Sequence, residues 1–367
     1  MTGKAPLVEV ENVSVRFGEV HAVDGVSFTV ERGEILGLVG ESGSGKSTLG
    51  RTVVGLVRHP SGRIVFDGRS VHEGSRAAQR ALRMRMQVIF QEAKASLSPR
   101  HRIGWLLQEP YAINKVPKAG RRTSEGLLAE VGLPAEIATK YPHQVSGGQA
   151  RRVSVARAIA LRPDFLFADE ATAGLDASTA ASLLNMLRDL VDENGLTILL
   201  VSHDLNVVGA IADRIAVMYL GRIVEMGPAE GVVGRPSHPY TRALLASVPV
   251  VDASEIGRVV APLEGEPPSS IAPPPGCHFH PRCAHAIPPM LADASGVRRG
   301  GTEAHGLLPP LARSTTDMRS DDRLDEEVVV RNILRGQPGV RFAKRSQEGV
   351  RSSRKQCWRS SGMSGSN

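Results

Sequence analysis

The chain has 367 residues, and its 41% hydrophobic and 23% charged content is ordinary for a globular protein. Aromatic residues make up only 4%, which argues against stacking surfaces for nucleic-acid bases. The net charge of +7 comes mostly from the C-terminal end, because residues 295–367 hold 14 Lys and Arg against 8 Asp and Glu. The remainder is nearly neutral, so we expect no nucleic-acid partner.

Cysteine content and hydropathy indicate the redox compartment and the kind of membrane association to expect. The three cysteines, Cys277, Cys283 and Cys357, are too few for a disulfide framework and fit a reducing compartment. No stretch reaches the roughly 18 apolar residues that a membrane-spanning helix needs. Charged residues interrupt even the most apolar region, 197–220. We therefore expect any membrane association to go through partner subunits.

The N-terminal part of the chain is predicted to contain strands, turns and one helix. Residues 7–17 alternate in hydrophobicity, and 26–30 form a second strand pattern before a turn. Residues 35–40 are a continuous apolar run that ends in glycine, as in a buried parallel strand. A glycine-rich loop and a predicted helix, 46–57, follow, and 62–68 are a further strand and turn.

Strand and helix patterns alternate in the next part of the chain. Residues 70–160 carry many helix formers and are predicted to be a mostly helical insertion. Apolar strands at 165–169 and 197–203 flank a predicted helix that ends at Gly195, and 214–227 are predicted to form a closing hairpin. This order predicts an α/β fold with a parallel sheet.

Residues 40–48, GESGSGKST, fit the phosphate-binding pattern G-x-x-x-x-G-K-[ST] between a strand and a helix. The glycines allow backbone N–H groups to point at a β-phosphate, and the helix N-terminus adds positive potential. Lys46 is predicted to reach the β- and γ-phosphates of ATP, and the Ser47 hydroxyl to bind Mg²⁺. The predicted nucleotide-binding residues of this loop are Gly40, Ser42, Gly43, Ser44, Gly45, Lys46, Ser47 and Thr48.

Two acidic residues, Asp169 and Glu170, end the predicted strand 165–169. A buried strand delivers such residues to the carboxyl edge of the sheet, where open α/β folds bind ligands beside the phosphate loop. Asp169 is predicted to hold Mg²⁺, directly or through water. Glu170 is predicted to accept a proton from, or to orient, the water that attacks the γ-phosphate.

Residues 145–149, VSGGQ, complete a set of three motifs that together resemble those of ABC ATPases. The resemblance implies a P-loop (RecA-like) core with an N-terminal antiparallel β subdomain, a helical signature subdomain and a small C-terminal extension. A serine and two glycines at a helix N-terminus form a second anion-binding turn. The family implies that Ser146, Gly147, Gly148 and Gln149 cap ATP bound to a second ABC ATPase subunit, in a homo- or heterodimer.

Four further positions match the same family. The resemblance implies that Phe17 stacks on adenine and that Gln91 contacts Mg²⁺ or the attacking water. It also implies that Asp176 lies in the loop that crosses to the opposite site, and that His203 grips the γ-phosphate. Gln91 and His203 therefore join Glu170 as the predicted catalytic residues.

Two downstream segments, HPYTRALL (238–245) and GCHFHPRC (276–283), resemble the C-terminal extension of oligopeptide/dipeptide importer ATPases. This implies ATP hydrolysis coupled to solute import at the cytoplasmic face of the cell membrane. The implied partners are two transmembrane permease subunits and, indirectly, an extracytoplasmic solute-binding protein. A soluble ABC ATPase without transport and a non-hydrolysing partner subunit stay open as alternatives, as does the identity of the solute.

These patterns predict three divisions of the chain. Residues 1–228 are expected to form the nucleotide-binding domain, with a helical subdomain over about 92–160. Residues 229–294 form the predicted extension. Residues 295–367 are poor in large apolar side chains and are expected to be a disordered basic tail.

Three features depart from the family pattern. Ala171 stands where Pro usually follows the catalytic Glu, and Ala150 where Arg is commoner after SGGQ. Some importer ATPases look able to bind an iron–sulfur cluster, which usually needs four thiolates. Here Met290 occupies the third position, so we expect no cluster. For Cys277 and Cys283, packing and a two-cysteine metal site with neighbouring histidines both stay open.

Overall fold

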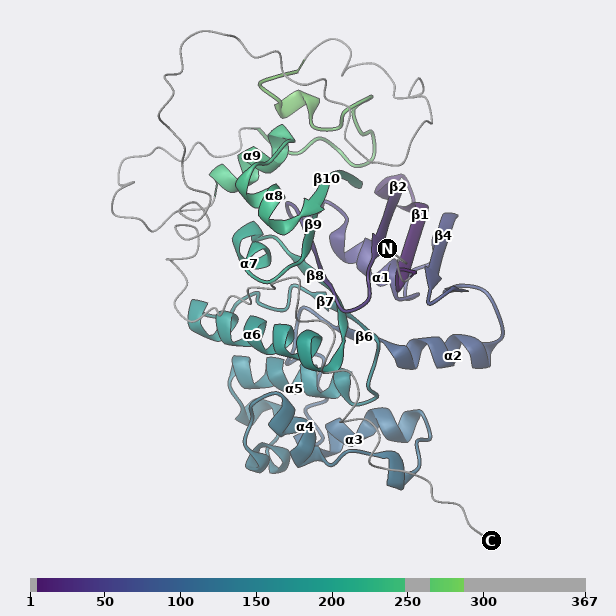
Figure 1. Ribbon diagram of the computed structural model, residues 1–367, viewed down its shortest axis with the longest axis vertical. Helices are drawn as coiled ribbons and strands as arrows, with labels where there is room; N and C mark the ends of the chain where they lie inside the picture. Colours follow the sequence, from purple (N-terminus) through teal and green to yellow (C-terminus); the bar gives the residue numbers. More distant parts are fainter. Residues whose placement is uncertain (1–4, 248–264, 287–367) are drawn as a thin grey trace.

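The computed structural model describes residues 5–247 and 265–286 (Figure 1). In this part of the chain no helix is long and apolar enough to cross a bilayer. The predicted tail 295–367, Met290 and Cys357 lie outside the described residues.

A four-stranded antiparallel sheet forms the N-terminal part, in the order β2-β1-β4-β5. Its buried side chains, among them Val10 of β1 and Phe28 of β2, pack in one cluster with Leu49 of α1. The sheet thus covers one side of the phosphate-loop helix. Its strands are β1 (Val8–Phe17), β2 (Val20–Val30), β4 (Ser61–Phe66) and β5 (Arg69–Ser70).

A six-stranded sheet, in the order β10-β9-β3-β8-β7-β6, forms the centre of the fold. Five strands run parallel, and only β10 is antiparallel to its neighbour β9. The register pairs Val39 with Ser202 and Asp169 with Val201, so β3, β8 and β7 end at the same edge. The strands are β3 (Ile35–Val39), β6 (Met86–Ile89), β7 (Phe165–Asp169), β8 (Thr197–Ser202), β9 (Arg214–Tyr219) and β10 (Arg222–Pro228).

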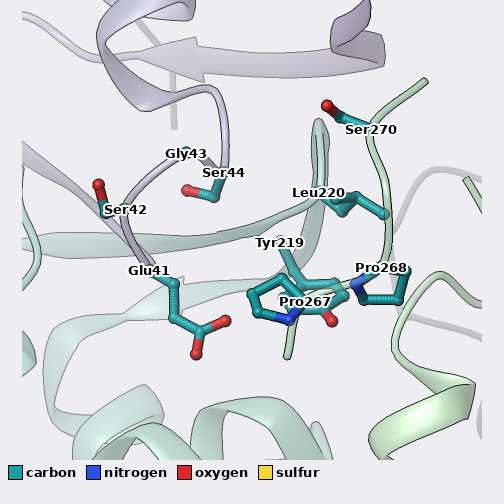
Figure 2. Close-up of a pocket in the computed structure, with 9 residues that line it drawn as sticks. All are labelled: Glu41, Ser42, Gly43, Ser44, Tyr219, Leu220, Pro267, Pro268 and Ser270. Atoms are coloured by element: carbon teal, nitrogen blue, oxygen red, sulfur yellow. The ribbon is translucent and has the colours of Figure 1, made fainter. Parts of the chain in front are cut away.

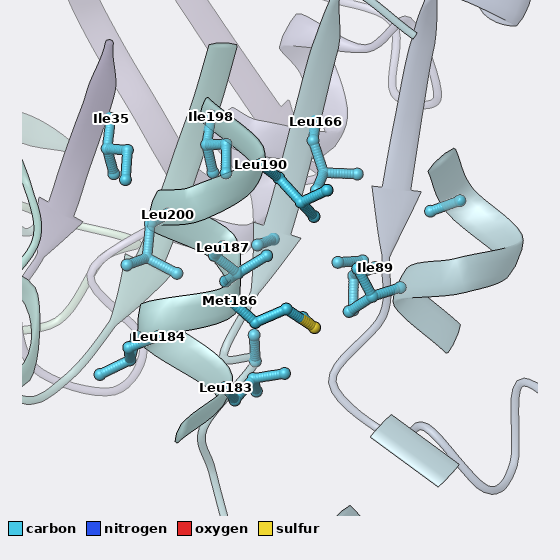
Figure 3. Close-up of a cluster of buried hydrophobic side chains, with 14 of the residues drawn as sticks. Ile35, Ile89, Leu166, Leu183, Leu184, Met186, Leu187, Leu190, Ile198 and Leu200 are labelled. Carbon is cyan, nitrogen blue, oxygen red and sulfur yellow. The ribbon is translucent and has the colours of Figure 1, made fainter. Parts of the chain in front are cut away.

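Side chains of the central strands alternate between two hydrophobic clusters, as the period of a strand requires. In β7, Phe165 and Phe167 join the cluster that contains α1, whereas Leu166 and Ala168 join the cluster that contains α6. Figure 3 shows the α6 side chains lying over the second face of the sheet. The helices on these faces are α1 (Lys46–Val53), α6 (Ala177–Asn194), α7 (Leu205–Gly209), α8 (Ala229–Gly234) and α9 (Pro239–Ala246).

A group of helices that contains the signature lies at one end of the molecule (Figure 1). Residues 70–160 are largely helical as predicted, but β6 lies within this segment and was missed. Its four residues are too few for a clear periodicity, and only pairing with β7 makes them a strand. The helices of this group are α3 (Ile103–Ile113), α4 (Ser124–Glu130) and α5 (Gly147–Ile159), with short 3₁₀ turns between α3 and α5. The helix α2 (Arg76–Arg85) lies apart from them and precedes β6 (Figure 1).

The contact between α1 and β7 positions the phosphate loop and can be tested directly. A Cβ on Gly50 would lie 2.1 Å from the Phe167 ring, which is fully buried. We expect Gly50→Ala to destabilise the protein by about 1–3 kcal/mol through overpacking, measured by thermal unfolding. Gly231→Ala is the matched control, because Gly231 in α8 has open space at its Cβ position. Unchanged stability of Gly50→Ala would contradict this packing.

Candidate active site

The loop between β3 and α1 lies so close to its neighbours that two positions admit only glycine. A Cβ on Gly40 would lie 2.1 Å from the Met218 carbonyl oxygen, and one on Gly45 would lie 2.1 Å from the Ala22 carbonyl oxygen. Gly45 also has a φ of 103°, which other residues rarely adopt. Gly43, by contrast, is exposed with open space around it. The loop therefore packs against neighbouring backbone at Gly40 and Gly45 and is open to solvent at Gly43.

Lys46 begins α1, and its side chain lies back along the loop. Its Nζ donates hydrogen bonds of 2.7 Å to the carbonyl oxygens of Gly40 and Glu41, and a longer one of 3.4 Å to Ser44 Oγ. Burial lowers the pKa of Lys46, and the nearby carboxylates of Glu170 and Asp169 oppose this shift. Three oxygen acceptors of the loop thus surround the ammonium group.

Ser47 and Asp169 meet at the start of α1 and the end of β7. Ser47 Oγ donates a 2.7 Å hydrogen bond to Asp169 Oδ1, and Arg51 Nη2 lies 3.1 Å from Asp169 Oδ2. The Asp169 side chain is fully buried; Arg51 and the nearby Lys46 offset its charge, and Ser47 provides a hydrogen bond. A hydroxyl and a carboxylate that converge in this way fit the oxygen ligands of Mg²⁺.

Glu170 lies between two other predicted site residues. Gln91 Nε2 donates a 2.9 Å hydrogen bond to Glu170 Oε2, and His203 Nδ1 lies 3.6 Å from Glu170 Oε1. The Glu170 backbone has a φ of 47°, an uncommon conformation for a residue other than glycine. Its N–H donates to Val201 O at 3.0 Å, which holds it in place. The structure therefore brings the three predicted catalytic side chains together at one edge of the sheet.

The signature residues form the N-terminal cap of α5. Ser146 Oγ accepts a hydrogen bond from the N–H of Gln149, and the Gln149 side chain accepts one from the N–H of Ser146. This reciprocal capping box leaves Ser146 and Gly147 exposed. The turn therefore lies at the exposed N-terminal end of α5.

Asp176 and Phe17, two further predicted site residues, lie outside the phosphate loop, at the start of α6 and the end of β1. The Asp176 carboxylate caps α6 by accepting from the Thr179 N–H and from the hydroxyls of Ser178 and Thr179. These bonds lower the pKa of Asp176 and hold the loop that precedes α6. Thr179 also lies under the signature turn, because a Cβ on Gly148 would be 2.7 Å from its methyl group. Phe17, at the end of β1, exposes 53% of its surface.

Comparison with known proteins assigns the chain to a family. Residues 23–173 match the model described as "ABC transporter", and residues 224–289 match the "Oligopeptide/dipeptide transporter, C-terminal region". A protein of Sinorhizobium fredii, named "Probable peptide ABC transporter ATP-binding protein", is 44% identical over 303 residues, which cover 78% of this chain and 85% of that protein. This chain belongs to the ATP-binding proteins of ABC transporters.

Other relatives agree with this assignment of an ABC ATPase. A Brucella ovis protein, named "Putative peptide import ATP-binding protein", is 45% identical over 77% of this chain and 91% of its own length. The solved structure of cbiO1 from Clostridium perfringens, part of an ABC transporter complex, matches with a TM-score of 0.58 and 27% identity, over 63% of this chain and 92% of that one. The dimeric cassette MJ0796, solved with ADP and Pi, matches with a TM-score of 0.54 and 26% identity, over 60% of this chain and 98% of that one.

One residue of the ABC ATPase site escaped the sequence interpretation. Arg151 of α5 is buried and donates hydrogen bonds to the carbonyl oxygens of Phe90, Gln91 and Ala173. It therefore joins the segment that carries Gln91 to the loop before α6. Burial lowers the pKa of Arg151. Its position after SGGQ was visible in the sequence, but its three carbonyl partners are distant in the chain.

The two cysteines of the extension pack against the larger hydrophobic cluster. Burial raises the pKa of the Cys277 thiol. The neighbouring histidines turn Nδ1 toward carbonyl oxygens, His278 to that of Leu220 and His280 to that of Cys277. Among the residues described, no group of three or more His, Cys, Asp and Glu side chains is arranged to hold a metal ion. These contacts suit a packing role.

Arg151 offers a test of how Gln91 is positioned. We expect Arg151→Lys to lower the turnover number for ATP by about tenfold or more, because one ammonium cannot hold three carbonyl groups in the geometry of a guanidinium. The KM for ATP should change by less than about threefold, since Arg151 does not contact the phosphate loop. Steady-state ATPase kinetics measure both constants.

The neighbouring arginine provides the matched control for this experiment. Arg152 lies on the same helix and donates to Val131 O and Ser182 Oγ, away from Gln91. Arg152→Lys should leave both kinetic constants near the wild-type values. Equal losses of turnover in the two variants would mean that Arg151 has no specific effect on Gln91.

Proposed function

We propose that this chain hydrolyses ATP to drive the import of peptides through a membrane complex. The observation that carries the proposal is the convergence of Ser47, Asp169, Glu170, Gln91 and His203 at one sheet edge beside the phosphate loop. Hydrolysis of a γ-phosphate needs phosphate binding, a metal site and a carboxylate for water at the same place.

The loop residues would bind the triphosphate. Lys46 would donate to the β- and γ-phosphates, and loop N–H groups from Ser42 onward would contact the same oxygens. Phe17, the last residue of β1, would stack on the adenine ring. Ser47, Asp169 and Gln91 are the residues that would hold Mg²⁺, which neutralises charge on the phosphates when bound.

Glu170 would act on the attacking water. Its carboxylate orients the water in line with the γ-phosphate and accepts its proton, while Gln91 and His203 hold the carboxylate from both sides. His203 would also donate to the γ-phosphate oxygens as charge develops there. Most of the rate enhancement in this arrangement comes from positioning and electrostatics.

A second ATPase subunit would complete each site. The exposed turn of Ser146, Gly147 and Gly148 faces outward, so it caps the γ-phosphate held by a partner chain, and the loop of Asp176 lies at the same interface. The MJ0796 cassette, whose structure is titled dimeric, supports this arrangement. Because nucleotide binds across two chains, ATP favours the closed dimer and hydrolysis releases it.

Peptide import is supported by the C-terminal region. Residues 224–289 match the oligopeptide/dipeptide transporter region, and both relatives described above carry peptide transport in their names. We propose two permease subunits as membrane partners, an extracytoplasmic solute-binding protein as an indirect one, and a peripheral position on the cytoplasmic face. Residues 1–228 act as the nucleotide-binding domain, with the helical subdomain 92–160 contacting the permeases, and 229–294 act as the extension.

Glu170→Gln tests the catalytic part of this proposal. We expect ATP turnover to fall by about a hundredfold or more, since the amide cannot accept the proton from water. The Kd for ATP should stay within about threefold of the wild-type value. Phosphate release and nucleotide binding, measured on the assembled transporter, separate the two effects.

Two further variants make this experiment decisive. Lys46→Ala should weaken ATP binding itself, because the buried ammonium is lost from the phosphate site. Glu193→Gln, at an exposed position of α6, is the matched control and should leave both quantities unchanged. A turnover number of Glu170→Gln equal to that of the wild type would contradict the proposed role of Glu170.

A further inference from the structure

The two C-terminal segments that resemble the importer extension both contact one residue of the phosphate loop, Glu41. The Glu41 backbone N–H donates a 2.8 Å hydrogen bond to the Tyr240 hydroxyl of α9. The Glu41 carboxylate accepts two hydrogen bonds from the Arg282 guanidinium, of 2.8 and 3.1 Å. Figure 2 shows Glu41 at the edge of a pocket, beside Tyr219 and the segment that carries Pro267.

Tyr240 and Arg282 lie in a buried aromatic cluster, and the Glu41 side chain that they hold is 26% exposed. Tyr240 is fully buried, with its ring centroid 4.6 Å from that of Tyr219 and 5.4 Å from that of Phe279. The Arg282 side chain is only 4% exposed and lies over the Tyr219 ring. Burial raises the pKa of Tyr240 and keeps its hydroxyl neutral. Charge-assisted bonds in such a setting are stronger than on an exposed surface.

Glu41 is also one of the residues to which Lys46 is bonded. The Glu41 carbonyl oxygen accepts one of the 2.7 Å hydrogen bonds from Lys46 Nζ. The C-terminal segments thus contact Glu41 at its N–H and its carboxylate, while its carbonyl oxygen helps to position the Lys46 ammonium group. A shift of Glu41 would therefore disturb both the loop backbone and an acceptor of Lys46.

We propose that Tyr240 and Arg282 are positioning residues that hold the phosphate loop in its ATP-binding conformation, so that the C-terminal region sets the affinity for nucleotide. This inference rests on the proposed function, because it concerns the same site. By linkage, any partner that shifts α9 or residues 276–283 changes ATP affinity, and ATP stabilises the packing of these segments by the same free energy.

Tyr240→Phe removes only the hydroxyl and keeps the buried ring. We expect the KM and Kd for ATP to rise by about three- to tenfold, the effect of one lost hydrogen bond to a buried backbone group. The turnover number should stay within about twofold of the wild-type value, because Tyr240 does not contact the reacting atoms. A fluorescent ATP analogue measures the Kd, and steady-state kinetics of the full assembly measure the split between KM and turnover.

Two control variants separate this effect from general stability. Thr241→Val lies next in α9 and removes a buried hydroxyl that has no hydrogen-bond partner among the described residues. Tyr111→Phe removes a buried tyrosine hydroxyl that donates to Ala160 O in the helical region. Both variants should bind ATP as the wild type does. An equal loss of affinity in either control would overturn the inference.

A double-mutant cycle tests the ion pair. Glu41→Gln and Arg282→Gln should each weaken ATP binding, and the double variant should bind ATP about as weakly as Arg282→Gln alone, because Arg282→Gln already removes the ion pair with Glu41 along with the contact to Tyr219. Independent effects that multiply would overturn the inference, as would unchanged affinity of Tyr240→Phe. Absence of ATPase activity in the wild-type assembly would instead defeat the proposed function, so the two failures are distinguishable.

Discussion

The parallel pairing of β3, β8 and β7 is the constraint on which the site depends. Its register places the ends of these strands level, with Val39 opposite Ser202 and Asp169 opposite Val201. The phosphate loop, the acid pair and His203 each follow one of these strand ends. A change of one residue in register would move Asp169 away from Ser47 and turn its side chain to the other face of the sheet.

The phosphate loop and the signature turn of this ABC ATPase differ in how the rest of the fold holds them. The phosphate loop is fixed from several directions, by backbone at Met218 and Ala22 and by the C-terminal contacts to Glu41. The signature turn is a self-contained capping box at the exposed end of α5. This difference suits a site in which one half binds nucleotide alone and the other half arrives with a partner chain.

Much of this arrangement could be predicted from the sequence because its signals are local. The apolar runs before Gly40 and Glu170 predict β3 and β7, and glycine spacing predicts the loop between β3 and α1. The strand β6 could not be predicted, since its four residues have too little periodicity of their own. The same holds for Arg151 and Tyr240, whose partners are far away in the chain and become neighbours only through folding.

The predicted roles of single residues depend on geometry that local patterns do not contain. For Asp176 the family resemblance implies a place in a crossing loop, which stays a prediction, and the structure shows its carboxylate capping α6. The uncommon backbone conformation of Glu170 was likewise invisible in the sequence. It follows from the sharp turn that the chain makes between the buried end of β7 and the loop that leads to α6.

We propose that nucleotide is shared between the phosphate loop of one chain and the signature turn of another. An experimental structure of the ATP-bound assembly would show this sharing. We expect Ser146 to lie within hydrogen-bond distance of the γ-phosphate held by the facing subunit. A triphosphate that contacts residues 40–48 of this chain and no signature turn from the facing subunit would contradict it.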